Sequence, residues 1–454
     1  MANDLTQGSM FKNLMRFSLP YLLSCFLQTF YGLADLFITG QFYGADAITA
    51  VSVGSQITHM LTVVIVGLAM GATVAVGHGT GAGKRERVAK AVGNTVTLFA
   101  AFSAVLTVVL ILCLDGIVAA VSTPAEAVGQ AGEYLLVCFA GIPFITAYNV
   151  ISSIFRGMGD SRTPMYFVAA AGVLNIILDY ILIGPCGMGA MGAALATVIA
   201  QGCSVALGLT VMLRRKAVPT GLAIGDFRPE EETMKGILRV GIPIAAQDGF
   251  IQISFLVITA IANSRGVDVA AAVGIVEKLI GFFFLVPSAM LSSVSAIAAQ
   301  NAGAGKHGQS RSVLRYGICV SVCFGLVVAM FCQPGAELLL RPFAREEPEV
   351  IRLGAQYLRA YSFDCAVAGI HFCFSGYFCA YGKAALSFLH NLLSVLLVRI
   401  PGAYLASVFF SESLYPMGWS APAGSLLSAG ICVVFYFLMK FRNFYQVKAD
   451  MDIV

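Results

Sequence analysis

Residues 14–40 read LMRFSLPYLLSCFLQTFYGLADLFITG and are long and apolar enough to cross a lipid bilayer as one helix. Asp35 is the acidic residue of this stretch and lies among Tyr31, Leu36 and Phe37. An ionisable group in a membrane helix is costly unless it faces the protein interior or water, which makes Asp35 a candidate functional residue. The alternative for Asp35 is a solvated position at the outer interface.

The composition places the whole chain in the membrane class. Of its 454 residues, 58% are hydrophobic and 11% are charged, and the mean hydropathy is +0.84. Soluble domains carry about 25% charged residues, so the composition predicts an all-α polytopic membrane protein. The lead before the first apolar segment has no small-residue cleavage site, so that segment is expected to be a membrane helix and not a signal peptide.

Apolar segments bounded by Gly, Pro and charged residues predict twelve transmembrane helices. Their approximate ranges are 14–40, 48–77, 91–114, 133–155, 164–184, 188–213, 237–262, 270–299, 313–333, 353–380, 384–409 and 416–440. Most Lys and Arg residues fall in the connections on one side, including Lys84, Arg85, Arg87, Lys306 and Arg311. The positive-inside rule therefore predicts that both termini are cytoplasmic in a cell-membrane protein.

The two halves of the chain repeat. Gly81-Ala82-Gly83-Lys84 recurs as residues 303–306, and the stretch 155–159 is matched by residues 378–382. The hydrophilic connection between the halves predicts an N-lobe at 1–213, a cytoplasmic linker at 214–236 and a C-lobe at 237–454. Two repeats of six helices with the same orientation are typical of secondary transporters, which bind their substrate between or within the halves.

Polar residues inside the predicted membrane helices are the candidate site residues. Asn175 and Asp179 are four residues apart and share one face of the fifth helix. A carboxylate beside an amide can be hydrogen-bonded when ionised and still tolerate protonation, as a proton- or cation-coupled site requires. Thr197 lies in the sixth helix among small residues. The alternative is an interhelical polar clamp that holds these helices to the first helix.

The second half has its own buried polar candidates. Asp364 and His371 are seven residues apart, so they share a helix face. An ion pair between Arg399 and either Glu277 or Asp364 is the structural alternative, and His371 is either a proton relay or a packing histidine. We expect His390 to be a packing residue without a partner. The complete second-half set is Asp248, Gln252, Glu277, Asp364, His371 and Arg399.

These motifs together resemble the multidrug and toxic compound extrusion (MATE) family over nearly the whole chain. The resemblance rests on residues 155–164, the loop 81–83, residues 175–179 and 192–197, and Arg399-Ile400-Pro401. It implies cation-coupled efflux of organic cations through a cavity between two six-helix lobes. In the DinF-like branch, the corresponding N-lobe residues form the coupling site, which assigns that role to Asp35, Asn175, Asp179 and Thr197.

The C-lobe departs from the family pattern. Gln252 stands where the NorM-type branch has an acidic residue, and Asp364 comes about one turn before that branch's acid in the tenth helix. Protons are therefore the expected coupling ion, with sodium as the alternative. No resident metal or other cofactor is expected, and the chain is expected to act as a monomer.

Other functional classes fit less well. A lipid-linked oligosaccharide flippase of the same superfamily would need a basic cavity for its anionic cargo, whereas acids outnumber Lys278 and Arg399 inside the predicted membrane helices. An enzyme is not expected, because the sequence contains no HExxH motif, nucleophile elbow or clustered metal ligands. No nucleic-acid-binding motif or basic tail appears.

Overall fold

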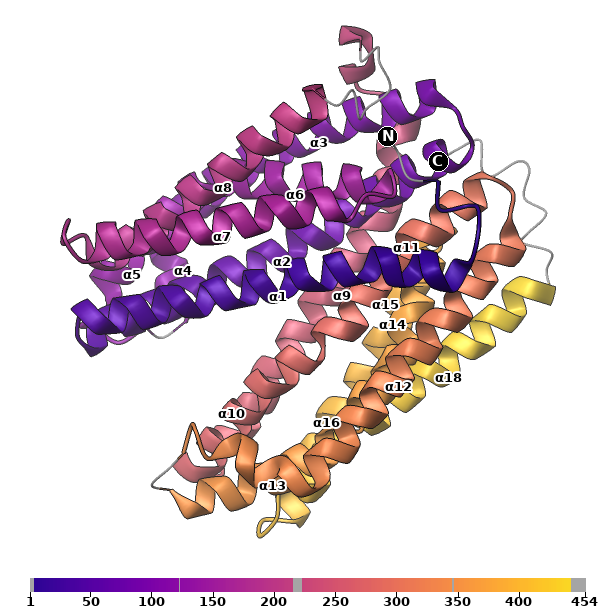
Figure 1. Cartoon of the computed structure of the whole chain (residues 1–454). Coiled ribbons are helices and arrows are strands. Elements are labelled where there is room, and N and C mark those ends of the chain that lie inside the picture. Colours follow the sequence, from indigo (N-terminus) through magenta and orange to yellow (C-terminus); the bar gives the residue numbers. More distant parts are fainter. Residues whose placement is uncertain (1–3, 122, 215–222, 345–346, 442–454) are drawn as a thin grey trace. The chain divides into compact units, whose positions relative to one another are not determined.

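The computed structural model describes residues 4–121, 123–214, 223–344 and 347–441. Every regular element in these ranges is a helix (Figure 1). Ten of the described helices are long and apolar enough to cross a membrane, or twelve if each of two bent helix pairs counts as one span. The predicted all-α polytopic fold is therefore confirmed. Linker residues 215–222 and both chain ends lie outside the described residues.

The chain forms two compact units that do not coincide fully with its two halves. The first unit is mainly Leu19–Leu238, and the second comprises Leu5–Ser18 and Arg239–Val454. Two long helices, α1 (Met10–Phe42) and α9 (Glu231–Asn263), therefore each contribute to both units. Both carry a proline just beyond the division, Pro20 in α1 and Pro243 in α9.

In the first unit, α2 and α6 pack against each other, and both also pack against α3, α5 and α8. Apart from α1, the elements of this unit are α2 (Ala45–Gly81), α3 (Arg85–Leu112), α4 (Leu114–Ala120), α5 (Val128–Ala140), α6 (Ile142–Gly157), α7 (Arg162–Ile183), α8 (Gly189–Arg214) and the short η1 (Ile224–Phe227). α7 packs against α8. Since α1, α7 and α8 carry the four N-lobe candidate residues, these three helices define the candidate site.

In the second unit, α14 packs against α11, α12, α15 and α18. The remaining elements after α9 are α10 (Val267–Phe283), α11 (Leu285–Gly303), α12 (His307–Leu340), α13 (Pro348–Tyr361), α14 (Asp364–Ala380), α15 (Ala384–Ser394), the π-helix η2 (Val395–Arg399), α16 (Ile400–Phe409), α17 (Tyr415–Gly418) and α18 (Ser420–Phe441). Nearly every residue of α14 is buried, so its polar side chains must find partners within the unit or remain without them.

The sequence repeat is also a repeat of backbone geometry. Gly83 and Gly305 both have a positive φ, at 67° and 72°. The following lysines close equivalent turns, with Lys84 N donating to Gly79 O at 3.1 Å and Lys306 N donating to Asn301 O at 2.8 Å. A left-handed residue that closes a helix end is favourable mainly for glycine, which explains why this motif occurs in both halves.

Two spans are bent at related places in the two units. α5 and α6 meet at 48°, and α13 and α14 meet at 41°. Pro143 follows the first bend, and its missing N–H prevents the helical hydrogen bond to Phe139. At the second bend, Cys365 N bonds to Ser362 O, three residues back, instead of the residue four back. A tightened turn therefore separates α13 from α14.

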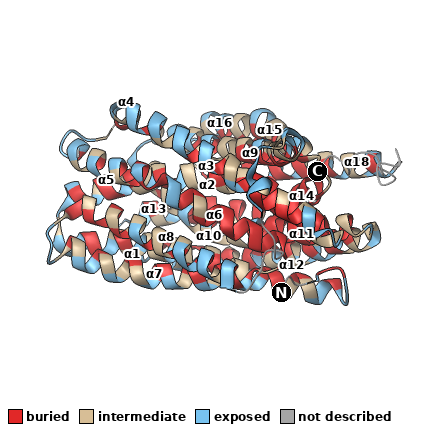
Figure 2. Cartoon of the chain, turned by 90° about the horizontal axis from the view of Figure 1, so that it is seen from above, coloured by how far each residue is buried: buried red, intermediate tan, exposed pale blue. Residues whose placement is uncertain are grey.

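The outward surfaces of the helices are apolar, as a bilayer environment requires. Leu112, Leu213 and Phe409 are 80%, 75% and 73% exposed. Exposed residues lie along most of the outer helices in Figure 2, whereas α11 and α14 are largely buried. Large apolar side chains in such numbers would be unfavourable in water but are favourable against lipid tails.

The end of the linker is fixed to α3 within the first unit. Asn94 donates to Asp226 O at 3.3 Å and accepts from Glu230 N at 2.7 Å. Lys90 pairs with the Glu230 carboxylate at 3.1 Å. A Cβ at Gly93 would lie 2.2 Å from Asp226 O, so glycine allows this close approach. The described end of the linker is thus a packed part of the first unit.

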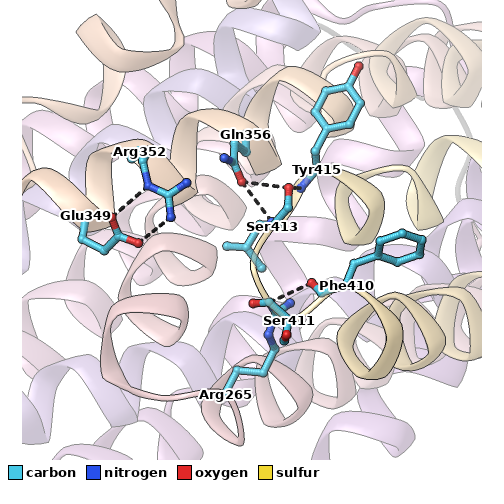
Figure 3. A network of polar contacts seen from close by, with 9 residues as sticks. Arg265, Glu349, Arg352, Gln356, Phe410, Ser411, Ser413 and Tyr415 are labelled. Atoms are coloured by element: carbon cyan, nitrogen blue, oxygen red, sulfur yellow. Dashed lines mark hydrogen bonds and ion pairs between the residues drawn. The ribbon is translucent and has the colours of Figure 1, made fainter.

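The connections at one end of the second unit are joined by polar contacts (Figure 3). Arg265, between α9 and α10, donates to Phe410 O at 3.2 Å and to Ser411 O after α16. Gln356 of α13 accepts from Ser413 Oγ at 3.0 Å. Arg265 therefore has a structural role. This role accounts for an arginine on the membrane side that the sequence predicts to be poor in Lys and Arg.

Replacement of Gly325 by alanine should destabilise the second unit. Its Cβ would lie 2.3 Å from the backbone of Ala366, so α12 and α14 would have to move apart. We expect a loss of about 1–3 kcal/mol in the free energy of unfolding, the usual size for overpacking. Gly335→Ala in the same helix is the matched control, because its Cβ meets only the Phe331 ring at 3.7 Å. Equal thermal unfolding of the two purified variants would contradict the packing described here.

Removal of the Glu230 carboxylate should give a small, pH-dependent loss of stability. Hydrogen bonds from Thr233 and Lys90 lower the pKa of Glu230. A carboxylate whose pKa is lower in the folded than in the unfolded protein stabilises the fold at any pH above its unfolded pKa. This stabilisation is lost as the pH falls through the pKa of the folded state. We expect Glu230→Gln to cost less than about 1 kcal/mol at neutral pH because the pair is solvent-exposed. Thermal unfolding of Glu230→Gln and the control Glu231→Gln should differ at pH 7 and converge in acid.

Candidate functional site

The first unit brings the four N-lobe candidate residues together. Thr197 of α8 donates to Asp35 Oδ2 of α1 at 3.4 Å, and Asn175 Nδ2 of α7 donates to Thr197 Oγ1 at 3.4 Å. The carboxyl groups of Asp35 and Asp179 also interact with each other. Three helices therefore meet at one polar cluster, which is called the acidic cluster below.

The acidic cluster is removed from the surface of the unit. Asp35 and Asn175 are 4% and 1% exposed, and Asp179 is fully buried. The solvated alternative for Asp35 is therefore wrong. Both oxygens of Asp179, Oδ1 of Asp35 and Oδ1 of Asn175 have no hydrogen-bond partner among the described residues. Buried polar groups normally have partners, so these atoms mark a place where a proton, water or cation can be accommodated.

Aromatic and apolar side chains surround the acidic cluster. Tyr134 of α5 lies close enough to Asp35 and Asp179 for an electrostatic interaction. Gln201 of α8 donates to the Tyr31 hydroxyl at 3.4 Å, one turn from Asp35 along α1. No ion pair joins either acid to a basic residue in the described part of the unit. Two neighbouring carboxyls without a cationic partner favour uptake of a proton or attraction of a cation.

The second unit assembles some of its predicted candidates into a different arrangement. Arg399, at the end of the π-helix η2, donates to the Tyr361 hydroxyl. Its guanidinium lies over the Phe255 ring at 4.9 Å. Asp364 and Glu277 lie within electrostatic reach of Arg399. The alternative of an ion pair with Arg399 is not formed as a direct contact. Neither oxygen of Asp364 has a hydrogen-bond partner among the described residues, and Oε1 of Glu277 has none either.

His371 and His390 of the second unit form a polar network with serines. His371 Nε2 lies 3.3 Å from Ser425 Oγ, and its ring is 5.5 Å from that of His390. His390 contacts Ser375 Oγ at 2.9 Å and Ser428 Oγ at 3.2 Å. The expectation that His390 has no partner is therefore wrong, whereas its complete burial agrees with a packing role. These contacts join α14, α15 and α18.

Asp248 and Gln252 are placed apart from this arrangement. Both are half-buried on α9, and neither is hydrogen-bonded to Glu277, Asp364, His371 or Arg399 in the described structure. Gln247, next to Asp248, is 1% exposed, and both its amide atoms are without partners among the described residues. Gln247 was not named as a candidate site residue from the sequence. Its position next to the candidate Asp248 was the signal that could have pointed to it.

Three other residues of the second unit were missed by the sequence analysis. Tyr361 and Phe255 orient Arg399, and Thr259 donates to Glu277 Oε2 at 3.1 Å. Pro401 was the sequence signal for the π-helix η2. Because proline has no backbone N–H, Leu397 O receives no helical hydrogen bond from residue 401, and a widened turn can form before the proline. Among the described residues, no group of three or more His, Cys, Asp or Glu side chains could hold a metal ion.

Substitution of Thr197 by valine should weaken the acidic cluster without changing its shape. Asp35 Oδ2 and Asn175 Nδ2 would both lose the hydroxyl that links them. Leaving buried polar atoms without a partner costs about 1–3 kcal/mol. Because both hydrogen bonds of Thr197 are long, we expect the loss in the free energy of unfolding to lie near the lower end of this range. Thermal unfolding of purified protein measures the effect, with Thr197→Ser as the control that keeps the hydroxyl. If the two variants unfold at the same temperature, the link has no energetic role.

Comparison with known proteins gives consistent matches over most of the chain. The family model MatE matches twice, at residues 20–181 and 243–405, which reproduces the internal repeat. The probable multidrug resistance protein YpnP of Bacillus subtilis is 30% identical over 92% of this chain and 93% of its own length. The probable multidrug resistance protein NorM of Thermotoga maritima is 27% identical over 89% of this chain and 87% of its own.

A solved structure supports the fold at lower identity. A transporter of the MOP superfamily from Pyrococcus furiosus has a TM-score of 0.90 with 22% identity, and the match covers 98% of both chains. That protein is described as having a binding pocket of reverse polarity that suggests a different function. At this identity the likeness establishes the shared fold, whereas substrate and coupling depend on the residues of each chain.

Proposed function

Because this chain belongs to the MatE family, the multidrug and toxic compound extrusion family that its motifs resemble, we propose that it exports organic cations and amphiphilic compounds in exchange for protons. The buried acidic cluster is the observation that carries this proposal. The names of the relatives, probable multidrug resistance proteins, support the substrate class. The site of action is the cell membrane, with both termini cytoplasmic, and the chain acts as a monomer.

The acidic cluster suits a proton–cation exchange because its charge changes with one proton. When Asp35 and Asp179 are ionised, they attract a cationic substrate through an environment of low dielectric constant. Protonation removes that attraction and allows the substrate to leave. Thr197 donates to the Asp35 carboxyl and accepts from Asn175, so these two residues orient the Asp35 side chain. The exchange needs no bound cofactor.

Alternating access is proposed to arise from movement of one unit against the other. Pro20 and Pro243 lie just beyond the residues where α1 and α9 pass between the units. A proline inside a helix removes one backbone hydrogen bond and lowers the resistance to bending. Because Asp35 is on α1, bending of that helix would couple the protonation state of the acidic cluster to the movement.

The stoichiometry determines how strongly such a transporter can pump. Exchange of one proton for one monovalent cation moves no net charge, so the pH gradient alone drives it, by about 1.4 kcal/mol or tenfold per pH unit. A second proton would add about 2.3 kcal/mol per 100 mV of membrane potential. Sodium is the alternative coupling ion, because the cluster presents carboxylate, amide and hydroxyl oxygens that could bind it.

Substitution of Asp35 by asparagine should abolish efflux driven by a pH gradient. Asparagine has nearly the same shape as aspartate but neither binds the exchanged proton nor attracts a cation. We expect the rate of efflux of a fluorescent organic cation from proteoliposomes to fall by at least about tenfold. Imposing a pH gradient and a sodium gradient in separate experiments distinguishes the two coupling ions.

Asp46→Asn is the matched control for this measurement. Asp46 is an exposed acid near the start of α2, outside the acidic cluster, so its substitution should leave efflux near the wild-type rate. Wild-type efflux driven by sodium alone would replace the proton by sodium in the proposal. Undiminished efflux by a folded Asp35→Asn variant would remove the acidic cluster from the coupling mechanism.

A further inference from the structure

The second unit contains three charged side chains that the proposed exchange does not use. Glu277 comes from α10, Asp364 from the first turn of α14, and Arg399 from the π-helix η2. Asp364 is fully buried, Arg399 is 8% exposed and Glu277 is half-buried. These three side chains are called the charged triad. Charged side chains are rare in membrane helices and usually pair with one another or have a function.

Arg399 is fixed in place by neutral groups and not by an acid. Its Nη2 donates to the Tyr361 hydroxyl, and its guanidinium faces the rings of Phe255 and Tyr361 at 4.9 Å and 5.7 Å. Its Nε has no partner among the described residues. Asp364 and Glu277 lie within electrostatic reach of Arg399 but make no direct hydrogen bond to it. The charged triad is therefore an open arrangement of donors and acceptors.

The charges of the triad do not cancel when both acids are ionised. The arginine side chain keeps its charge in proteins, so it compensates one carboxylate and leaves the other uncompensated. An isolated buried carboxylate takes up a proton rather than bear the cost of desolvation. The other titratable side chains that face the triad are Tyr357, Tyr361, Cys365 and His371. They carry no compensating positive charge in their neutral forms, and Lys278 is exposed.

We infer that Asp364, Glu277 and Arg399 form a second proton-binding site, which holds one proton on one of the two carboxyl groups while Arg399 compensates the other. This site lies wholly within the second unit and does not depend on the acidic cluster or on the coupling ion proposed above. A transporter with a proton site in each unit can exchange more than one proton per cycle, which would make export sensitive to the membrane potential.

A proton fits the triad better than a metal cation does. A sodium ion bound between Asp364 and Glu277 would lie close to the guanidinium group, and two like charges at short range in a protein interior repel by several kcal/mol. A proton on one carboxyl adds no separate charge near Arg399. The proton also turns one carboxylate oxygen into a hydrogen-bond donor. The other carboxylate oxygens of the triad that have no partner among the described residues can accept this hydrogen bond.

Infrared spectroscopy of the full-length protein tests this inference, because protonated carboxyls absorb separately from carboxylates. The measurement uses the Asp35→Asn/Asp179→Asn variant in lipid nanodiscs at neutral pH, so that the acidic cluster contributes no signal. Glu277→Gln and Asp364→Asn should each remove about one protonated carboxyl, because Arg399 then compensates the remaining acid. Arg399→Gln should add about one, because both acids then lack compensation. Arg399→Lys, which keeps the charge, should leave the signal unchanged.

The opposite signs of these changes separate a proton site from an ion pair. If both acids are ionised against Arg399, neither Glu277→Gln nor Asp364→Asn removes a protonated carboxyl, and the inference is overturned. It is also overturned if replacing choline with sodium removes the protonated-carboxyl signal of the Asp35→Asn/Asp179→Asn protein, which would identify a sodium site. Should Arg399→Gln not fold, Glu277→Gln and Asp364→Asn alone decide between these outcomes. The acidic cluster is absent throughout, so failure of the coupling proposal cannot mimic any of these results.

Discussion

The exclusion of water from the bilayer interior is the constraint on which this structure depends. Each backbone polar group within the hydrocarbon region must be satisfied inside the chain, which restricts the spans to helices. The same constraint makes each buried charge expensive unless a partner or a proton neutralises it. The acidic cluster and the charged triad are two places where the described chain accepts this cost, and they lie in different units.

The two units have the same ancestry in sequence but different interior electrostatics. The family model matches both halves, and the turns at Gly83 and Gly305 are equivalent. The first unit has neighbouring acids without a described basic partner, whereas the second unit has Arg399 within electrostatic reach of both Asp364 and Glu277. A duplicated scaffold can therefore keep its helix packing while its polar interior diverges, because packing depends on small and apolar residues and charge depends on a few positions.

Much of the fold could be predicted from the sequence because apolar segment length and composition are local properties. The helical, membrane-spanning fold and the internal repeat needed no knowledge of packing. The grouping of Asn175 with Asp179 followed from helical spacing, whereas the addition of Asp35 and Thr197 needed the family resemblance. The structure brings these four residues together, and their coupling role stays a prediction. The partners of His390 and Arg399 were not predictable, because they lie 38 residues away in Ser428 and Tyr361.

The sequence by itself determined the class, the number of apolar segments and the family, since each depends on composition or on motifs along the chain. Tertiary structure decided which face of each helix is buried, because helices that are apolar on most sides carry little directional signal. Tertiary structure also decided which polar atoms lack hydrogen-bond partners. A shift of one residue along a helix would turn Asp364 or Asp179 toward different neighbours. The division of α1 and α9 between the two units was likewise decided by packing, because the same apolar sequence suits either side.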